Sequence, residues 1–407
     1  MDPSLALFIS IFLILILIRR IDVGIAIFIG ALTLGILTIG PTTFERLIIT
    51  ILKFETIRLI IILILAFTLG YSMQNLGLLK SLCDSVSNLI GKLSIVLLPM
   101  IVGLLPMPGG ALISAIMIKD LVEKYSVKPA EATFINYWFR HIWVPVWPLY
   151  PSIVICAAII KVGYIEIIKA TYPIMIGMLL AGIIYIRNYF EKSKSNYNNN
   201  IDINNANANN KLKLSIDIFK SSYPILLIAI LGLIFKLDLL VTLLLALAIL
   251  YAHKRPSVEQ LKEILRKTVD IKIVILIIAI MCYEDLITYT HSAQVFFNHL
   301  NNLNVPLPLA AFILSFIVGF SVGIEISYSA IALPLLIMFT GVGDELIPKN
   351  LMLVIAGGLV GVMLSPLHLC LILTSQYYSV KLIKVYKFLI PAGVILTIVS
   401  WIYYLII

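Results

Sequence analysis

Charged residues are scarce in this 407-residue chain: Asp, Glu, Lys and Arg together make up 13%, whereas hydrophobic residues make up 61%. A soluble domain has about a quarter charged residues and is close to half apolar. The low charge excludes an ordinary soluble domain and predicts an all-α, multi-pass protein of the cell membrane. The net charge of +9 does not indicate a nucleic-acid partner, because Lys and Arg concentrate in the cytoplasmic loops of membrane proteins.

Cysteine and catalytic motifs are also scarce. The four cysteines have neither CxxC nor Cys/His spacing, so we expect no disulfide framework, metal site or cofactor. No HExxH, GxSxG or Walker sequence occurs, which excludes the common zinc, serine and ATP-driven chemistries. The run from Gly341 to Asp344 matches the GxGD of intramembrane aspartyl proteases, but no mid-span aspartate complements it. We therefore expect no enzyme.

Long apolar runs dominate the sequence. A spanning helix needs about 20 mostly apolar residues, which predicts full spans near 3–19, 22–40, 56–75, 131–160, 165–187, 218–236, 238–253, 270–288, 349–380 and 386–407. Two further apolar stretches, 93–121 and 306–341, contain Pro or Gly near their middle and are predicted to be re-entrant hairpins. Pro and Gly also interrupt 131–160 and 349–380, which we interpret as broken helices.

The basic residues test this topology. An apolar run precedes Arg19 and Arg20, which is typical of an uncleaved anchor with its N-terminus outside rather than of a signal peptide. With that orientation, both termini lie outside. Lys and Arg then fall on the inside in a roughly threefold excess, as the positive-inside rule requires.

The chain divides into two similar halves, 1–190 and 215–407. The Asn-rich segment 191–214 between them is predicted to be a disordered cytoplasmic linker. Pro148 and Pro366 have the same separation in sequence as Pro173 and Pro391. An odd number of spans in each half makes the second half an inverted copy of the first. Broken helices in matching positions of such repeats are typical of a transporter binding site.

Arg140 is the strongest candidate for substrate binding. It lies about ten residues into a predicted span, on the order of 15 Å deep at ~1.5 Å per residue, where a charge costs several kcal/mol. Asn136, Arg140, Trp143 and Trp147 have helical spacing and are predicted to share one face that binds substrate, with the two tryptophans lining the pocket. A guanidinium suits an anionic group of a substrate. A structural pair with Glu325 and a surface arginine remain the alternatives.

Glu325 lies near the middle of the second predicted hairpin, with Ser321, Ser327 and Ser329 nearby. It is a candidate for coupling to H⁺ or Na⁺, together with Ser321 and Ser329, with an ion pair to Arg140 as the alternative. His368 follows Pro366 in the second broken helix and corresponds to Tyr150 in the first. Either could donate a hydrogen bond to substrate, although a packing role for His368 is equally consistent with the sequence.

Half-helices beginning near mid-membrane would add positive potential. A helix N-terminus carries about half a positive charge, and its free N–H groups bind anions. The segments Gly109–Gly110 and Ser327–Ser329 are predicted to begin such half-helices. They are therefore candidate substrate-binding positions.

His141 follows Arg140 in the sequence. It is predicted to point to a different face of the helix from Arg140 and to serve packing.

The runs LLPMPGGALISA (104–115) and NYWFRHIWVPVWPLYPS (136–152) resemble the prokaryotic membrane family DUF401. That family is grouped with the ion transporter superfamily of gluconate permeases and divalent-anion symporters. The resemblance covers essentially the whole chain. It implies an inverted-repeat elevator, often a homodimer, with two hairpin tips meeting the substrate. The symporters carry Ser-Asn-Thr at both tips, whereas this chain has PMPGG and SVGIEIS.

The sequence therefore predicts a secondary active transporter for a small organic anion, coupled to H⁺ or Na⁺. Its partners are the lipid bilayer, the anionic solute and a second copy of the chain. An uncoupled channel or facilitator and a non-transport membrane component are the alternatives. Uptake that cannot concentrate substrate would favour a channel. The sequence leaves the substrate, the coupling ion and the direction of transport open.

Overall fold

The computed structural model describes residues 1–107, 109–195, 208–302 and 304–407, and these residues form helices and connecting turns without a strand. The predicted all-α class is confirmed. In the first half the α-helices are α1 (Pro3–Leu17), α2 (Val23–Ile39), α3 (Thr42–Leu52), α4 (Phe54–Asn75), α5 (Leu78–Ile90), α6 (Ser94–Gly103), α7 (Gly110–Met117), α8 (Lys119–Lys124), α9 (Pro129–Arg140), α10 (Pro151–Ile160) and α11 (Tyr164–Ser195).

The helices of the second half begin at Ala208. They are α12 (Ala208–Leu227), α13 (Leu239–Lys254), α14 (Val258–Thr268), α15 (Ile271–Tyr289), α16 (Ser292–Asn302), α17 (Leu307–Val322), α18 (Leu333–Leu335), α19 (Ile337–Thr340), α20 (Pro348–Leu364), α21 (Leu369–Tyr377) and α22 (Leu382–Ile406). Two π-helical stretches, Ile228–Ile234 and Tyr328–Ala332, extend α12 and precede α18.

Local sequence sets many of these boundaries. Asp2 caps α1 by accepting hydrogen bonds from the backbone N–H groups of Ser4 and Leu5, and Ser257 forms a capping box with Gln260 at α14. Proline occupies the first turn of α9, α10 and α20, where its missing N–H is not needed. Gly323, with φ of 69°, ends α17.

Several helices are long and apolar enough to cross a membrane. The described residues contain 6 such segments: Phe54–Asn75, Leu78–Gly103, Tyr164–Ile186, Lys211–Ile234, Pro348–Tyr377 and Leu382–Ile406. Shorter apolar helices are Pro3–Leu17, Val23–Ile39, Pro151–Ile160, Leu239–Lys254 and Leu307–Val322. This pattern supports a membrane-spanning protein. The sides of the membrane and the number of crossings stay predictions.

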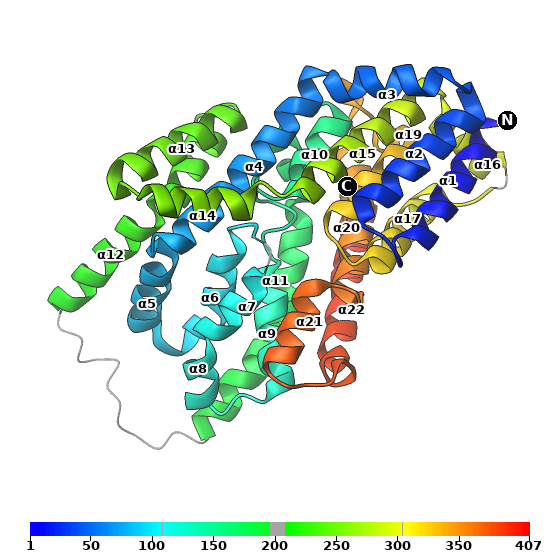
Figure 1. Cartoon of the computed structure of the whole chain (residues 1–407). Coiled ribbons are helices and arrows are strands. Elements are labelled where there is room, and N and C mark those ends of the chain that lie inside the picture. The colour runs from blue at the N-terminus through cyan, green and yellow to red at the C-terminus, as the bar shows by residue number, and fades with distance from the viewer. Residues whose placement is uncertain (108, 196–207, 303) are drawn as a thin grey trace.

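The helices gather in three groups (Figure 1). At one side, α1 and α2 pack together and α15 packs on α2. At the other side, α12 packs on α5, and α13 and α14 pack on α4. Between them lie α9, α11, α20 and α22, which contact one another. The central group positions the candidate site.

Four helix interruptions occur within the central group or beside it. Helix α6 ends at Gly103 and α7 begins at Gly110, while α9 ends at Arg140 and α10 begins at Pro151. In the second half α17 ends at Val322 before Tyr328, and α20 ends at Leu364 before Leu369. Pro and Gly in these gaps remove backbone donors or allow turns that end a helix.

The structure leaves parts of the predicted segments undescribed. Residues 196–207 of the predicted linker lie outside the described residues, while α11 runs to Ser195 and α12 begins at Ala208. Pro108 in the first interruption and residue 303 also lie outside them.

Candidate functional site

Arg140 lies at the C-terminal end of α9 and is buried. Its Nη1 is 3.6 Å from the Cys370 Sγ, and its Nη2 donates a long hydrogen bond of 3.4 Å to the Met107 carbonyl oxygen. Its Nε has no hydrogen-bond partner, and Arg140 forms no salt bridge with any described residue. The guanidinium therefore has no direct ion pair within the described part of the protein, although the Glu325 carboxylate is near enough to interact with it electrostatically.

Two glycines make room for Arg140. A Cβ on Gly110 would lie 2.3 Å from the Arg140 Nη2, and a Cβ on Gly103 would lie 2.1 Å from the Arg140 carbonyl oxygen. Any larger residue would therefore displace the guanidinium or the end of α9. Gly109, directly before α7, has a left-handed φ of 76° that favours glycine. The glycines of the first interruption thus set the position of the arginine.

His141 and His368 face each other across the two halves. His141 Nδ1 is 2.6 Å from the Tyr137 carbonyl oxygen, and His368 Nδ1 is 2.7 Å from the Gly323 carbonyl oxygen. A carbonyl oxygen only accepts, so each Nδ1 carries a proton and donates it. The two Nε2 atoms lie 3.2 Å apart. The sequence predicted a packing role for His141, but its imidazole lies within reach of both His368 and Glu325.

Glu325 and Cys370 complete this cluster. The Glu325 Oε1 is 3.2 Å from the His141 Nε2, and this side chain remains 18% exposed, unlike the fully buried His141. The donor atoms of His141, His368 and Cys370 lie within 4.8 Å of one another. Glu325 therefore forms its close contact with His141. The sequence had offered an ion pair between Glu325 and Arg140 as an alternative, and no such direct pair occurs among the described residues.

Asn136 and Tyr150 tie the interruptions together. The Asn136 Nδ2 donates to the Ala111 carbonyl oxygen at 2.9 Å and to the Thr374 Oγ1 at 3.2 Å, while its Oδ1 has no partner. The Tyr150 hydroxyl donates to the Gly103 carbonyl oxygen at 2.6 Å. Asn136 thus links α9 with α7 and α21, and Tyr150 links the start of α10 with the end of α6.

The serines near Glu325 have partners of their own. Ser327 Oγ donates to the Ile324 carbonyl oxygen at 2.7 Å, and Ser329 Oγ donates to the Ser152 carbonyl oxygen at 3.1 Å. Ser321 lies in the last turn of α17. Neither hydrogen bond joins these serines to Glu325, so the predicted coupling set is not one hydrogen-bonded group.

The two tryptophans do not continue the helical face of Asn136 and Arg140, and that prediction was wrong. Helix α9 ends at Arg140, and 141–150 form successive turns. Pro145 and Pro148 lack the N–H that a continuing helix needs. Trp143 Nε1 donates to the Met100 carbonyl oxygen at 3.0 Å. The buried Trp147 Nε1 has no partner.

A second charged cluster surrounds Asp285 on α15. Its carboxylate accepts hydrogen bonds from Arg46 Nε at 2.6 Å, Arg46 Nη2 at 3.0 Å and Lys53 Nζ at 2.6 Å. The Arg46 guanidinium lies 4.5 Å from the centre of the Tyr289 ring. These contacts fasten α3 and its junction with α4 to α15.

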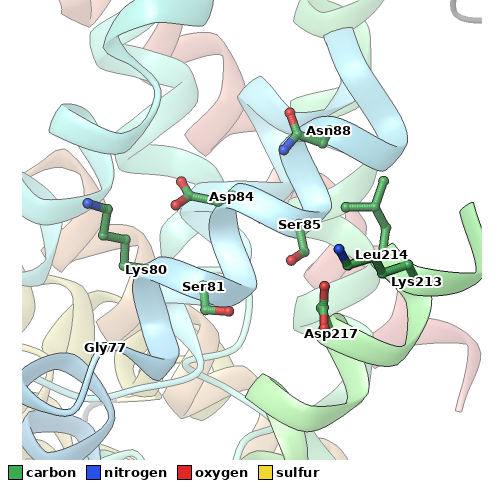
Figure 2. Close-up of a pocket in the computed structure, with 9 residues that line it drawn as sticks. All are labelled: Gly77, Lys80, Ser81, Asp84, Ser85, Asn88, Lys213, Leu214 and Asp217. Carbon is green, nitrogen blue, oxygen red and sulfur yellow. The ribbon is translucent and has the colours of Figure 1, made fainter. Parts of the chain in front are cut away.

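A polar groove of about 680 Å³ lies between α5 and α12. Figure 2 shows Ser81 and Ser85 of α5 on the side of Lys213 and Asp217 of α12, whereas Lys80 and Asp84 extend to the other side of α5. Both positive and negative side chains line this groove, and no residue of the Arg140 and His141 cluster does. The groove therefore belongs to the joint between α5 and α12 and not to the candidate site.

No curated protein matches the chain significantly. The family model described as "Protein of unknown function (DUF401)" matches residues 2–407, nearly the entire sequence. The chain therefore belongs to the DUF401 family.

Proposed function

We propose that this protein is a secondary transporter for a small organic anion, a carboxylate being the best fit, driven by a gradient of H⁺ or Na⁺. One observation carries the proposal: the buried Arg140, which forms no direct ion pair with a described carboxylate, lies beside the helix interruptions. The Arg140 contacts reach Met107 in the first interruption and Cys370 just after the fourth.

The energetics favour an anionic ligand at Arg140. A buried charge without a partner costs several kcal/mol. Arg140 has only a thiol and a long carbonyl contact, and its Nε is unpartnered. A guanidinium offers a planar fork of donors that matches a carboxylate. The anion would supply the missing charge, and the N-terminus of α7 at Gly110 would add further positive potential.

The order of the helices supports an inverted repeat with alternating access. In each half, a pair of helices is followed by an amphipathic helix (α3 or α14), a longer helix (α4 or α15), a second amphipathic helix (α5 or α16), two interrupted elements and a final long helix (α11 or α22). The interrupted elements and final helices pack centrally, with the others on either side. In this proposal the central group moves as a body against the flanking helices, and both interrupted hairpins are re-entrant.

The test is uptake by the full chain reconstituted in liposomes, with labelled mono-, di- and hydroxycarboxylates and separately imposed H⁺ and Na⁺ gradients. We expect concentrative uptake of one carboxylate class with one of the two gradients. Arg140→Gln should abolish it. Arg58→Gln is the matched control, because Arg58 forms an exposed ion pair with Asp238 away from the site.

Equal uptake by Arg140→Gln and the unsubstituted protein would contradict a substrate role for Arg140. Uptake that equilibrates but never exceeds the external concentration would support an uncoupled facilitator instead. Absence of uptake for every carboxylate, with correctly inserted protein, would remove the organic-anion proposal and favour a non-transport membrane component.

A further inference from the structure

The facing imidazoles of His141 and His368 need a positive species between them. Each Nδ1 proton is donated to a backbone carbonyl, so in a neutral ring the Nε2 carries a lone pair. Two lone pairs 3.2 Å apart repel in a buried site, where local polarity is low. Either a shared proton or a metal ion would resolve this repulsion.

From this geometry we infer that the protein binds a transition-metal dication of the Zn²⁺ class, held by His141 Nε2, His368 Nε2 and Cys370 Sγ. Zn–N bonds of about 2.0–2.1 Å in a tetrahedron place two nitrogens roughly 3.3 Å apart. The observed separation is 3.2 Å. Glu325 Oε1 is also 3.2 Å from His141 Nε2, but it is not one of the three mutually close donor atoms, so the fourth ligand would be solvent unless Glu325 moves.

The sulfur position requires only a small adjustment. The His141, His368 and Cys370 donor atoms lie within 4.8 Å of one another, whereas nitrogen and sulfur bound to one zinc ion are roughly 3.6 Å apart. A contraction of about 1 Å would close the site. The Cys370 thiol gives its proton to solvent as the metal–sulfur bond forms, and the guanidinium of Arg140 near its sulfur stabilises the thiolate.

The surroundings of the histidines are those of metal ligands. A metal-bound imidazole usually donates its other N–H to a carbonyl or carboxylate, which fixes the ring and directs its free nitrogen at the metal. The Tyr137 and Gly323 carbonyl oxygens do this for His141 and His368. These backbone bonds orient both rings before a metal arrives.

The donor set selects the class of ion. Imidazole and thiolate favour Zn²⁺, Co²⁺ or Ni²⁺, whereas Na⁺, Mg²⁺ and Ca²⁺ prefer sets of oxygen ligands. Glu325 and Cys370 are partly exposed, so the cluster is not sealed inside the protein. His141 comes from the first half and the other ligands from the second, so a bound metal would join the two halves.

The test is spectroscopic and does not depend on transport. Purified full-length protein is stripped with a chelator and titrated with Co²⁺, whose thiolate charge-transfer and tetrahedral d–d absorption bands identify the ligands. We expect one equivalent to produce both bands and Zn²⁺ to displace the Co²⁺. Cys370→Ser should lose the thiolate band, and Cys156→Ser, a buried cysteine on α10, should keep it.

A second pair of variants tests the histidines. His368→Gln should weaken Zn²⁺ binding at least tenfold, measured by competition with a chromogenic chelator, whereas His253→Gln, at an exposed histidine on α13, should not. Absence of the thiolate band in the unsubstituted protein would overturn the inference whatever the variants do. An undiminished band in folded Cys370→Ser would overturn it too. The pair would then hold a shared proton instead.

Discussion

Asp285 and Arg140 are both buried charged residues on apolar helices, with exposed fractions of 7% and 4%, and their surroundings differ. Asp285 accepts three hydrogen bonds from Arg46 and Lys53. Arg140 has a long carbonyl contact, a thiol and an unpartnered Nε. The first charge is neutralised by the chain itself. The second would be neutralised by a ligand.

The comparison separates two uses of charge inside one membrane protein. Asp285 joins two helices, and its partners lie on α3 and next to it, so its removal should affect folding first. Arg140 lies among helix ends where Gly103 and Gly110 leave room for it. Its removal should therefore affect ligand binding more than stability. Substitutions at each cluster should therefore give opposite patterns of stability and uptake.

Asp285→Ala should have the largest effect on stability. It leaves Arg46 and Lys53 facing each other without a carboxylate, and breaking a buried pair costs 3–5 kcal/mol. Because both cations are partly exposed, we expect the low end, about 3 kcal/mol. SDS titration in mixed micelles measures the free energy of unfolding. Glu166→Ala, which breaks the exposed Lys169 pair, should change it by less than about 0.5 kcal/mol. If Asp285→Ala is as stable as the unsubstituted protein, Asp285 does not stabilise the fold and the proposed difference between Asp285 and Arg140 fails.

Arg140→Gln should show the opposite pattern. It removes a buried charge that forms no direct ion pair with a described carboxylate, so the free energy of unfolding should change by no more than about 1 kcal/mol. Affinity for the transported anion should fall at least 100-fold, equivalent to about 2.7 kcal/mol. The ligand-induced rise in melting temperature reports this loss. If the variant loses much of its stability but keeps the ligand-induced rise in melting temperature, Arg140 stabilises the fold and does not bind the ligand.

The sequence predicts the helix interruptions well, because proline and glycine act locally. The gap between Gly103 and Gly110 contains Pro106 and Gly109, and the gap after Leu364 contains Pro366. No partner elsewhere in the chain is needed to end a helix at such residues. Arg140 was likewise identifiable, because a charge within an apolar run is costly wherever the chain folds.

The contacts across the two halves could not be predicted in the same way. His141 and His368 are more than 200 residues apart, and their lone pairs face each other only because α9 and α20 end side by side. Cys370 has no motif spacing to His141. The cluster of Asp285 with Arg46 has the same origin. Trp143 and Trp147 were misassigned because a period of 3.6 residues was extended through Pro145, where the helix has already ended.

Gly110→Ala tests how closely the fold positions Arg140. The new Cβ would lie 2.3 Å from the Arg140 Nη2, so the guanidinium must move while its charge remains. We expect anion affinity to fall about tenfold, or about 1.4 kcal/mol. Gly163→Ala is the control, since a Cβ there meets no atom within 4 Å. Ligand titrations that give equal affinity for both variants would show that the guanidinium position is unimportant.

Tyr150→Phe should have the smallest effect on stability and uptake. We expect Tyr150 to stabilise the fold, as Asp285 does, and not to bind the ligand. The hydroxyl was a sequence candidate for substrate binding, but it donates at 2.6 Å to the Gly103 carbonyl oxygen. Its removal should lower the free energy of unfolding by about 1 kcal/mol, the net contribution of a typical hydrogen bond. Because the hydroxyl is engaged within the protein, the KM for uptake should stay within about twofold. A large rise in KM at unchanged stability would mean that Tyr150 releases Gly103 and binds the anion. The candidate site would then extend from Arg140 to the start of α10.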